Sequence, residues 1–256
     1  MKVVALISGG KDSTYNMCQC VDDGHEIVAL ANLCPPDDGS AGDEMDSFMY
    51  QTVGHQAITA YAEAMQLPLF RATITGRPLT QSLEYDKRDG DEVEDLFDLL
   101  THVRQSGIGF EAISVGAIHS NYQRIRAENV CNRLGIQMLA YLWERDQEEL
   151  LQEMIDYGIE AILIKTAVIG LNRLHLGKRL EEVKDDLIRL KEEYGINVCG
   201  EGGEFETLTL DCPLFHKRLR IDESQTNLHS DDAFAPVYYM NPVKVSLVEK
   251  QLLAKS

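Results

Sequence analysis

The sequence predicts an α/β fold, in which a doubly wound parallel sheet is joined to a second, smaller α+β domain. Two observations lead to this prediction. In the first half of the 256 residues, short apolar runs alternate with segments of helical periodicity, the order expected when helices cover both faces of a parallel sheet. From Thr207 onward, the chain reads mostly as strand. We therefore expect two domains, residues 1–143 and residues 144–256.

Strands and helices alternate regularly through the first domain. Strands are predicted at residues 2–8, 26–33, 69–75 and 112–117. Helices are predicted at residues 11–23, 47–65 and 120–134 and from near Asp91 onward, with an acidic loop at residues 35–46. Right-handed crossovers would join these parallel strands into one sheet. If the first and fourth strands adjoin, the segments that follow them meet where the winding reverses, which is where such sheets bind ligands.

The second domain begins in the same way and then changes character. The run "EAILIK" (160–165) reads as a strand, and residues 180–194 have the periodicity of an amphipathic helix. The later segments "TLTLD", "RLRID" and "VYYMNPVKVSLV" read as strands. We expect them to form a smaller sheet packed on the first domain.

Composition and charge exclude several functional classes. Apolar residues make up 44% and charged residues 26%, as in an ordinary globular protein, and no apolar run approaches the ~20 residues of a membrane span. A net charge of −18 disfavours nucleic acid as a partner; it serves either solubility alone or a cationic or protein substrate. Six cysteines without a Cys-x-x-Cys pair, and no signal sequence, indicate reduced thiols and a cytoplasmic location.

The loop "SGGKDS" (8–13), between the first strand and the first helix, has the composition of a phosphate cradle. It is not a P-loop of the Gly-x-x-x-x-Gly-Lys-Ser/Thr type, because Asp12 follows Lys11 and Ala5 stands where the first glycine is required. It is not a dinucleotide fingerprint either, since no third glycine follows at the right spacing.

The physical chemistry of this loop nevertheless favours phosphate over a plain strand-to-helix turn. Gly9 and Gly10 allow backbone N–H groups to approach phosphate oxygens, and the helix N-terminus adds its partial positive charge. Lys11 adds a cation, and the hydroxyls of Ser8 and Ser13 add donors. Asp12 fits beside phosphate only with a divalent cation between them.

A second glycine-rich segment, "GEGGEFET" (200–207), concentrates three carboxylates. In an extended chain, Glu204 and Glu206 project to one face. The segment is either a solvated acidic loop or a ligand site, and we favour a site because Gly-Gly permits close backbone approach. The sequence also leaves open whether Arg124, Arg126 and Arg133 form a solvated helix face with pairs to Glu128, or whether Arg126 lies near a phosphate or the substrate carboxylate.

The loop at 8–13 resembles the PP-loop of the ATP pyrophosphatases. The segments "SVGAIHSNYQRIRAENVCNRLGIQMLAYLW" (114–143) and "CGEGGEFETLTLDCPLF" (199–215), with "ALANL" in the second strand, are similar to the diphthine–ammonia ligase family. The resemblance covers nearly the whole chain and implies a first domain of the PP-loop, adenine nucleotide alpha hydrolase-like type. It implies that ATP, with magnesium, activates the diphthine carboxylate of translation elongation factor 2 as an acyl-adenylate, releasing pyrophosphate. Ammonium then gives diphthamide and AMP.

Motif physics and resemblance together give the following expected site. The predicted ATP-binding residues are Ser8, Gly9, Gly10, Lys11, Asp12, Ser13, Ala31, Leu33 and Gly116, with Asp12 also as magnesium ligand. The predicted substrate-binding residues are Tyr122, Arg126, Glu128, Gly202 and Gly203. The predicted catalytic residues are Glu201, Glu204 and Glu206.

Two other functions remain open at this point. A PP-loop enzyme that modifies tRNA would need a basic groove and, usually, paired catalytic or metal-binding cysteines, and the sequence shows neither. A regulatory module that binds a nucleotide without chemistry would have no use for the carboxylates at 201–206. No segment resembles a glutaminase, so free ammonium is the expected nitrogen donor.

Overall fold

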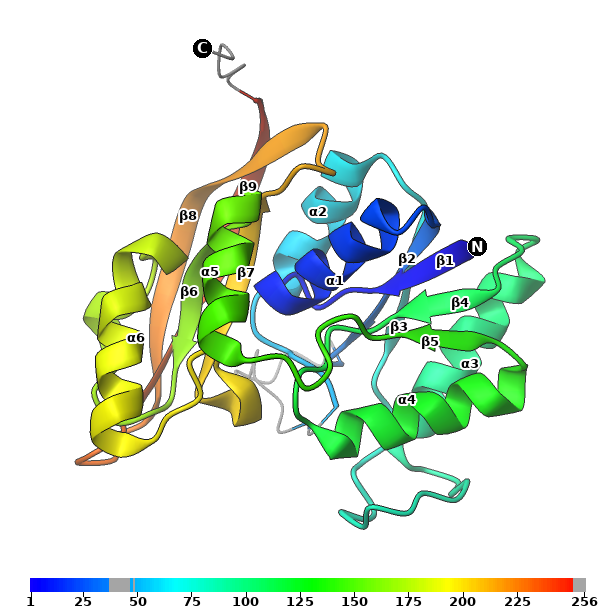
Figure 1. The fold of residues 1–256 in the computed structure, drawn as a ribbon, viewed down its shortest axis with the longest axis horizontal. Coiled ribbons are helices and arrows are strands. Elements are labelled where there is room, and N and C mark those ends of the chain that lie inside the picture. The colour runs from blue at the N-terminus through cyan, green and yellow to red at the C-terminus, as the bar shows by residue number, and fades with distance from the viewer. Residues whose placement is uncertain (37–46, 48, 251–256) are drawn as a thin grey trace.

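The computed structural model describes residues 1–36, 47 and 49–250, which form two sheets with helices around and between them (Figure 1). The first sheet has five strands in the order β3-β2-β1-β4-β5, and the second has four in the order β7-β6-β9-β8. In the described part of the chain, no helix combines the length and the apolar character needed to cross a membrane.

The first sheet is entirely parallel, as predicted. Its strands are β1 (Lys2–Leu6), β2 (Glu26–Cys34), β3 (Leu69–Thr73), β4 (Ala112–Ser114) and β5 (Gln137–Leu139). β1 pairs with both β2 and β4, which confirms that the first and fourth strands adjoin. The winding therefore reverses between β1 and β4, and the loops after these two strands lie at the switch point.

Helices cover both faces of this sheet. They are α1 (Lys11–Asp22), η1 (His55–Ala57), α2 (Ile58–Met65), α3 (Glu92–Gln105) and α4 (Asn121–Leu134). Because side chains alternate along a strand, Val4 and Ile113 pack in the cluster of α3 and α4, whereas Val3 and Ala5 pack in the cluster of α1 and α2. The predicted doubly wound α/β arrangement is confirmed.

The second half of the chain contains the antiparallel sheet. Its elements are α5 (Gln147–Tyr157), β6 (Glu160–Thr166), η2 (Arg173–His175), α6 (Leu180–Tyr194), η3 (Glu201–Gly203), β7 (Phe205–Asp211), β8 (Lys217–Ser230) and β9 (Val237–Glu249). α1 and α2 lie between the two sheets (Figure 1), and one hydrophobic core includes Met17, Tyr61, Leu163 and Leu208. The loop after β1 is thereby held against the second sheet.

One predicted helix is much shorter than its periodicity indicated. Helical structure in 47–65 begins only at His55. The Ser47 hydroxyl accepts the backbone N–H groups of Met49 and Tyr50, at 3.1 and 3.0 Å, a local pattern that competes with a helix. Gly54 then has a φ of 80°. Of the acidic loop predicted at 35–46, residues 37–46 lie outside the described residues.

Candidate nucleotide-binding and catalytic site

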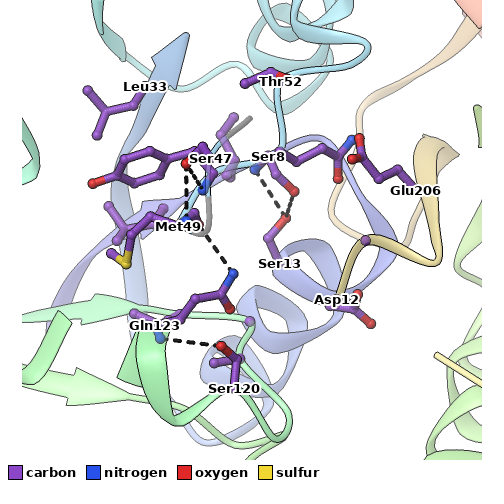
Figure 2. A pocket seen from close by; sticks show the side chains of 18 of the residues that line it. Ser8, Asp12, Ser13, Leu33, Ser47, Met49, Thr52, Ser120, Gln123 and Glu206 are labelled. Carbon is purple, nitrogen blue, oxygen red and sulfur yellow. Dashed lines mark hydrogen bonds between the residues drawn. The ribbon is translucent and has the colours of Figure 1, made fainter. Parts of the chain in front are cut away.

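A cavity of about 740 Å³ lies at the carboxyl ends of β1, β2 and β4 and reaches β6 and β7 of the second sheet. Among the predicted site residues, those that line it are Ser8, Lys11, Asp12, Ser13, Ala31, Leu33, Gly116, Tyr122, Glu201, Gly202, Gly203 and Glu206. Figure 2 shows Leu33 on one side and Glu206 on the other, with Ser8 and Ser13 between them. The predicted phosphate loop (residues 8–13) and the glycine-rich tract with the predicted catalytic carboxylates (residues 200–207) therefore line the same cavity.

The loop at 8–13 is held in shape by its own polar groups. The N–H of Ser8 donates to Ser13 Oγ at 3.3 Å, and the N–H of Gly10 donates to Ser8 Oγ at 3.2 Å. Gly9 has a φ of 87°, a left-handed conformation that favours glycine. The N-cap of α1 is Gly10, which has no side chain to cap the helix. This rigid turn therefore presents a helix N-terminus beside the cavity, the arrangement that suits an anion.

Lys11 does not project into the cavity as a free cation. It is only 2% exposed, and its Nζ donates to Asp12 Oδ2 at 2.9 Å and to the main-chain oxygen of Cys199. Its Nζ also lies 5.2 Å from the ring centre of Phe205, within cation–π range. Lys11 thus ties the loop to the glycine-rich tract of the second half.

Asp12 has the features of a metal ligand that acts together with phosphate. Its Oδ1 is buried and makes no hydrogen bond, and burial raises the pKa of this carboxyl against the opposing charge of Lys11. The described residues contain no cluster of three or more His, Cys, Asp or Glu side chains suited to a metal. Magnesium commonly takes one or two carboxylates and completes its shell with phosphate and water. Asp12 therefore fits a magnesium ion that arrives with a nucleotide.

β2 runs to Cys34, beyond Ala31, which pairs with Leu6 at the end of β1. The carbonyl of Ala31 accepts the N–H of Ile7 at 2.9 Å, so Ala31 is still paired with the chain of β1. Backbone groups of a parallel strand alternate between neighbours, so Leu33 points to the same side, beyond the end of β1. The side chains of Leu6, Leu96 and Leu99 line the cavity nearby. A planar base fits this apolar, hydrogen-bonding edge.

The loop after β4 lies directly on the first turn of α1. A Cβ built on Gly116 would lie 2.6 Å from the backbone nitrogen of Ser13, so only glycine fits there. The carboxylate of Glu201 accepts the backbone N–H of Ile118 at 2.9 Å and that of His119 at 2.8 Å. Glu201 therefore holds the β4–α4 loop while it lines the cavity.

The other two predicted catalytic carboxylates have different positions. Glu204 does not line the cavity: it accepts the backbone N–H of Asn197 at 2.6 Å, and burial raises its pKa. Glu206 does line the cavity and forms an ion pair with Lys165, with Oε1 and Nζ 3.2 Å apart. The alternation from Glu204 to Glu206 expected of a strand fails because β7 begins only at Phe205.

Two predicted substrate-binding residues lie away from the cavity. Arg126 is fully buried in α4 and donates to the main-chain oxygens of Thr80 and Ser82, so it anchors the loop before α3. Glu128 pairs with Arg124 on the helix surface at 2.7 Å, as the alternative interpretation had it. Among the predicted ATP-binding residues, Gly9 and Gly10 shape the loop without lining the cavity.

Tyr122 lines the cavity and is hydrogen-bonded to Glu92, a buried carboxyl group that the sequence did not mark as part of the site. Its hydroxyl donates to Glu92 Oε1 at 3.3 Å, and Ser47 Oγ donates to Glu92 Oε2 at 2.7 Å. Glu92 is fully buried, and burial raises its pKa. In sequence it stands at the start of a helix, where acids are common, so nothing marked it. Lys165, which also lines the cavity, was not predicted as a site residue because it ends an apolar run that reads as a core strand.

Two family models match most of the chain. Residues 1–138 match the family described as "Diphthamide synthase N-terminal domain", and residues 146–241 match "Diphthamide synthase C-terminal domain". The "Diphthine--ammonia ligase" of Homo sapiens is 58% identical over 251 residues, covering 98% of this chain and 94% of that protein. That of Danio rerio is 58% identical and covers 98% of both chains. That of Schizosaccharomyces pombe is 53% identical, covering 90% of this chain and 38% of its own length.

Solved structures were compared as well. A predicted subunit of tRNA methyltransferase from Methanocaldococcus jannaschii is 14% identical, with a TM-score of 0.36, covering 83% of this chain and 98% of that one. This score is too low to bear on fold or function.

Proposed function

The chain belongs to the diphthamide synthase family and is a diphthine–ammonia ligase, and from this premise we propose how its cavity carries out the reaction. The nucleotide is ATP with Mg²⁺, and the diphthine is carried by translation elongation factor 2. Ammonium supplies the nitrogen. The six cysteines are all free, and we place the reaction in the cytoplasm, where thiols stay reduced.

One observation supports this proposal above the others. The phosphate loop, the end of β2 and the carboxylates of Glu201 and Glu206 all line a single cavity. The adenine would pair with the backbone at Leu33, and the phosphates would lie over the loop at 8–13. Asp12 would hold Mg²⁺, which neutralises the leaving pyrophosphate. A volume of about 740 Å³ is within the range of ligand pockets and leaves room for the end of a modified side chain.

The chemistry follows from this placement. A diphthine carboxylate oxygen attacks the α-phosphorus, and pyrophosphate leaves over the N-terminus of α1, whose partial positive charge favours an anion. The nitrogen donor then attacks the acyl carbon, and AMP leaves. Glu206 lies in the wall of the second sheet, and we assign it to the ammonium. Glu201 keeps the β4–α4 loop in place beside the nucleotide.

The names of the relatives also favour amidation over the rival functions. The relatives reported above share the name diphthine–ammonia ligase, which favours this activity over tRNA modification or regulatory nucleotide binding.

The test is a reconstituted reaction. The full chain is incubated with ATP, magnesium, ammonium chloride and elongation factor 2 that carries diphthine, and the modified peptide is measured by mass spectrometry. We expect an amide with ammonium and none with ammonia-free glutamine alone. No amide under either condition would contradict the proposal.

A further inference from the structure

A partly buried ion pair lies in the wall of the cavity that the second sheet provides. Lys165 in β6 and Glu206 in β7 are directly opposite in the strand register, and both line the cavity. Their side chains are 13% and 15% exposed, with Nζ and Oε1 3.2 Å apart. Removing two charges from water costs free energy that their mutual attraction only partly returns. A pair of this kind in a cavity wall therefore suggests a task beyond stability.

The charges that line the cavity are few in the described part of the chain. They are Lys11, Asp12, Lys165, Glu201 and Glu206. Lys11 is 2% exposed and turned toward Asp12 and Cys199, while the carboxylate of Glu201 accepts two backbone N–H groups. Of the two lysines, Lys165 is the more exposed, and its ammonium pairs with Glu206 in the wall of the second sheet, whereas that of Lys11 is bound to Asp12 and Cys199.

The proposed reaction has two electrostatic demands at this place. The diphthine carboxylate is an anion that must approach a nucleotide of the same sign, and this approach is unfavourable without a cation beside it. The nitrogen donor arrives largely as ammonium at neutral pH and must lose a proton before it can attack. A lysine can supply the cation beside the substrate carboxylate, and the neighbouring glutamate can accept the proton from ammonium.

The backbone of paired strands holds both members of the ion pair in the cavity wall. Both residues lie on paired strands, which fix a side chain better than a loop does. The next residue, Thr207, accepts the backbone N–H of Lys11 through its Oγ1 at 3.0 Å. The ion pair is therefore one residue away from a direct contact with the phosphate loop.

We propose that Lys165 is a catalytic residue that binds the diphthine carboxylate for its attack on the α-phosphorus. This rests on the function proposed above. When the substrate carboxylate binds, it replaces Glu206 as the partner of Lys165, and Glu206 then receives the ammonium. One ion pair thereby orders the two half-reactions, because the ammonium site becomes available only when the acid is in place.

The steps balance without a further reactant. In the first, a bond forms between a carboxylate oxygen and the α-phosphorus, the bond from the α-phosphorus to the bridging oxygen breaks, and pyrophosphate leaves. In the second, ammonium gives one proton to Glu206, and the nitrogen lone pair attacks the acyl carbon. The carbon–oxygen bond to AMP breaks, and the second proton leaves to solvent.

The experiment measures the half-reactions separately in the full chain. Diphthine-dependent exchange of labelled pyrophosphate into ATP reports adenylation, and amide formation reports the whole reaction. The variants are Lys165→Met, Lys165→Arg and Glu206→Gln. The control is Lys217→Met, because Lys217 and Glu249 form a similar cross-strand pair that is exposed, with 2.9 Å between Nζ and Oε1.

We expect Lys165→Met to bind ATP within a few-fold of wild type and to lose about tenfold or more in exchange, with a raised KM for the protein substrate. Lys165→Arg should recover part of this loss. Glu206→Gln should keep exchange within a few-fold but form amide about tenfold or more slowly at low ammonium. Lys217→Met should resemble wild type in both assays.

Equal exchange by Lys165→Met and wild type would overturn the inference and leave the proposed function standing. So would an equal loss of exchange in Lys165→Met and Lys217→Met. No exchange by the wild-type protein would overturn the proposed function itself. If Lys165→Met does not fold, Lys165→Gln, which keeps a hydrogen-bond donor beside Glu206, carries the same test.

Discussion

The carboxylate of Glu201 accepts the backbone N–H of His119 at 2.8 Å. This bond joins the glycine-rich tract of the second half to the loop between β4 and α4. The other carboxylate oxygen of Glu201 accepts the N–H of Ile118 at 2.9 Å. A single side chain, more than 80 residues away in the sequence, therefore binds two backbone N–H groups that precede α4. Because Gly116 in the same loop contacts the start of α1, Glu201 also helps to position the phosphate loop.

Replacing Glu201 by Gln should therefore affect stability and nucleotide binding together. An amide offers one oxygen where the carboxylate offers two, and its NH₂ group would face an N–H donor. We expect Glu201→Gln to lower the free energy of unfolding by about 1–3 kcal/mol and to weaken ATP binding several-fold. Urea unfolding with and without ATP measures both effects. Glu249→Gln, at a position 81% exposed, is the control; equal behaviour of the two variants would refute the linking role.

The close contact at Gly116 gives a second prediction. In Gly116→Ala, the new Cβ would lie 2.6 Å from the backbone nitrogen of Ser13, so either the β4–α4 loop or the start of α1 must move. We expect ATP affinity to fall about tenfold or more, as measured by isothermal titration calorimetry. Gly109→Ala is the matched control, since a Cβ there meets nothing within 4 Å. ATP affinity that is unchanged in Gly116→Ala would contradict the packing described here.

A third prediction concerns stability at acid pH. Both terminal nitrogens of Arg133 donate to Glu94, at 2.8 and 2.7 Å, and Tyr85 donates to it at 3.0 Å. Burial alone would raise the pKa of Glu94, but these hydrogen bonds and the charge of Arg133 outweigh it and hold the pKa below its usual range. The carboxylate therefore stabilises the fold at pH values above the unfolded-state pKa, and this contribution is lost as the pH falls through the folded-state pKa.

Glu94→Gln should remove that contribution. We expect the free energy of unfolding to fall by on the order of 2 kcal/mol at pH 7, with a smaller difference from wild type at pH 3. Urea unfolding at a series of pH values tests this. Glu193→Gln, which breaks a solvent-exposed pair with Arg189, should lower the free energy of unfolding much less than Glu94→Gln. A difference between Glu94→Gln and wild type that does not change with pH would show that Glu94 does not titrate as described.

The fold and the phosphate loop could be predicted because their signals are local. The order of strands and helices follows from periodicity, and the requirements of the loop are contained in residues 8–13. Glu206 could be predicted to lie at a ligand site because adjacent glycines precede it and permit close backbone approach, although the strand alternation expected to place Glu204 beside it does not hold. The position of Leu33 in the cavity wall follows from its place near the end of the second strand.

The parts that could not be predicted depend on contacts between distant segments. Arg126 has the sequence context of a surface arginine, and only the return of the chain at 80–82 buries it. Lys165 forms its ion pair with Glu206, which lies on a strand 41 residues later in the sequence. Lys11, read as a phosphate cation, is drawn instead toward Cys199 by the packing of the second half on the first.

The central claim is that this cavity activates a carboxylate by adenylation. The most direct test is to incubate the protein with ATP, magnesium, ammonium and elongation factor 2 that carries diphthine, and to separate the nucleotide products by ion-exchange chromatography. The account predicts AMP and pyrophosphate, each formed in the same amount as the amide. ADP and phosphate as the main products would contradict it.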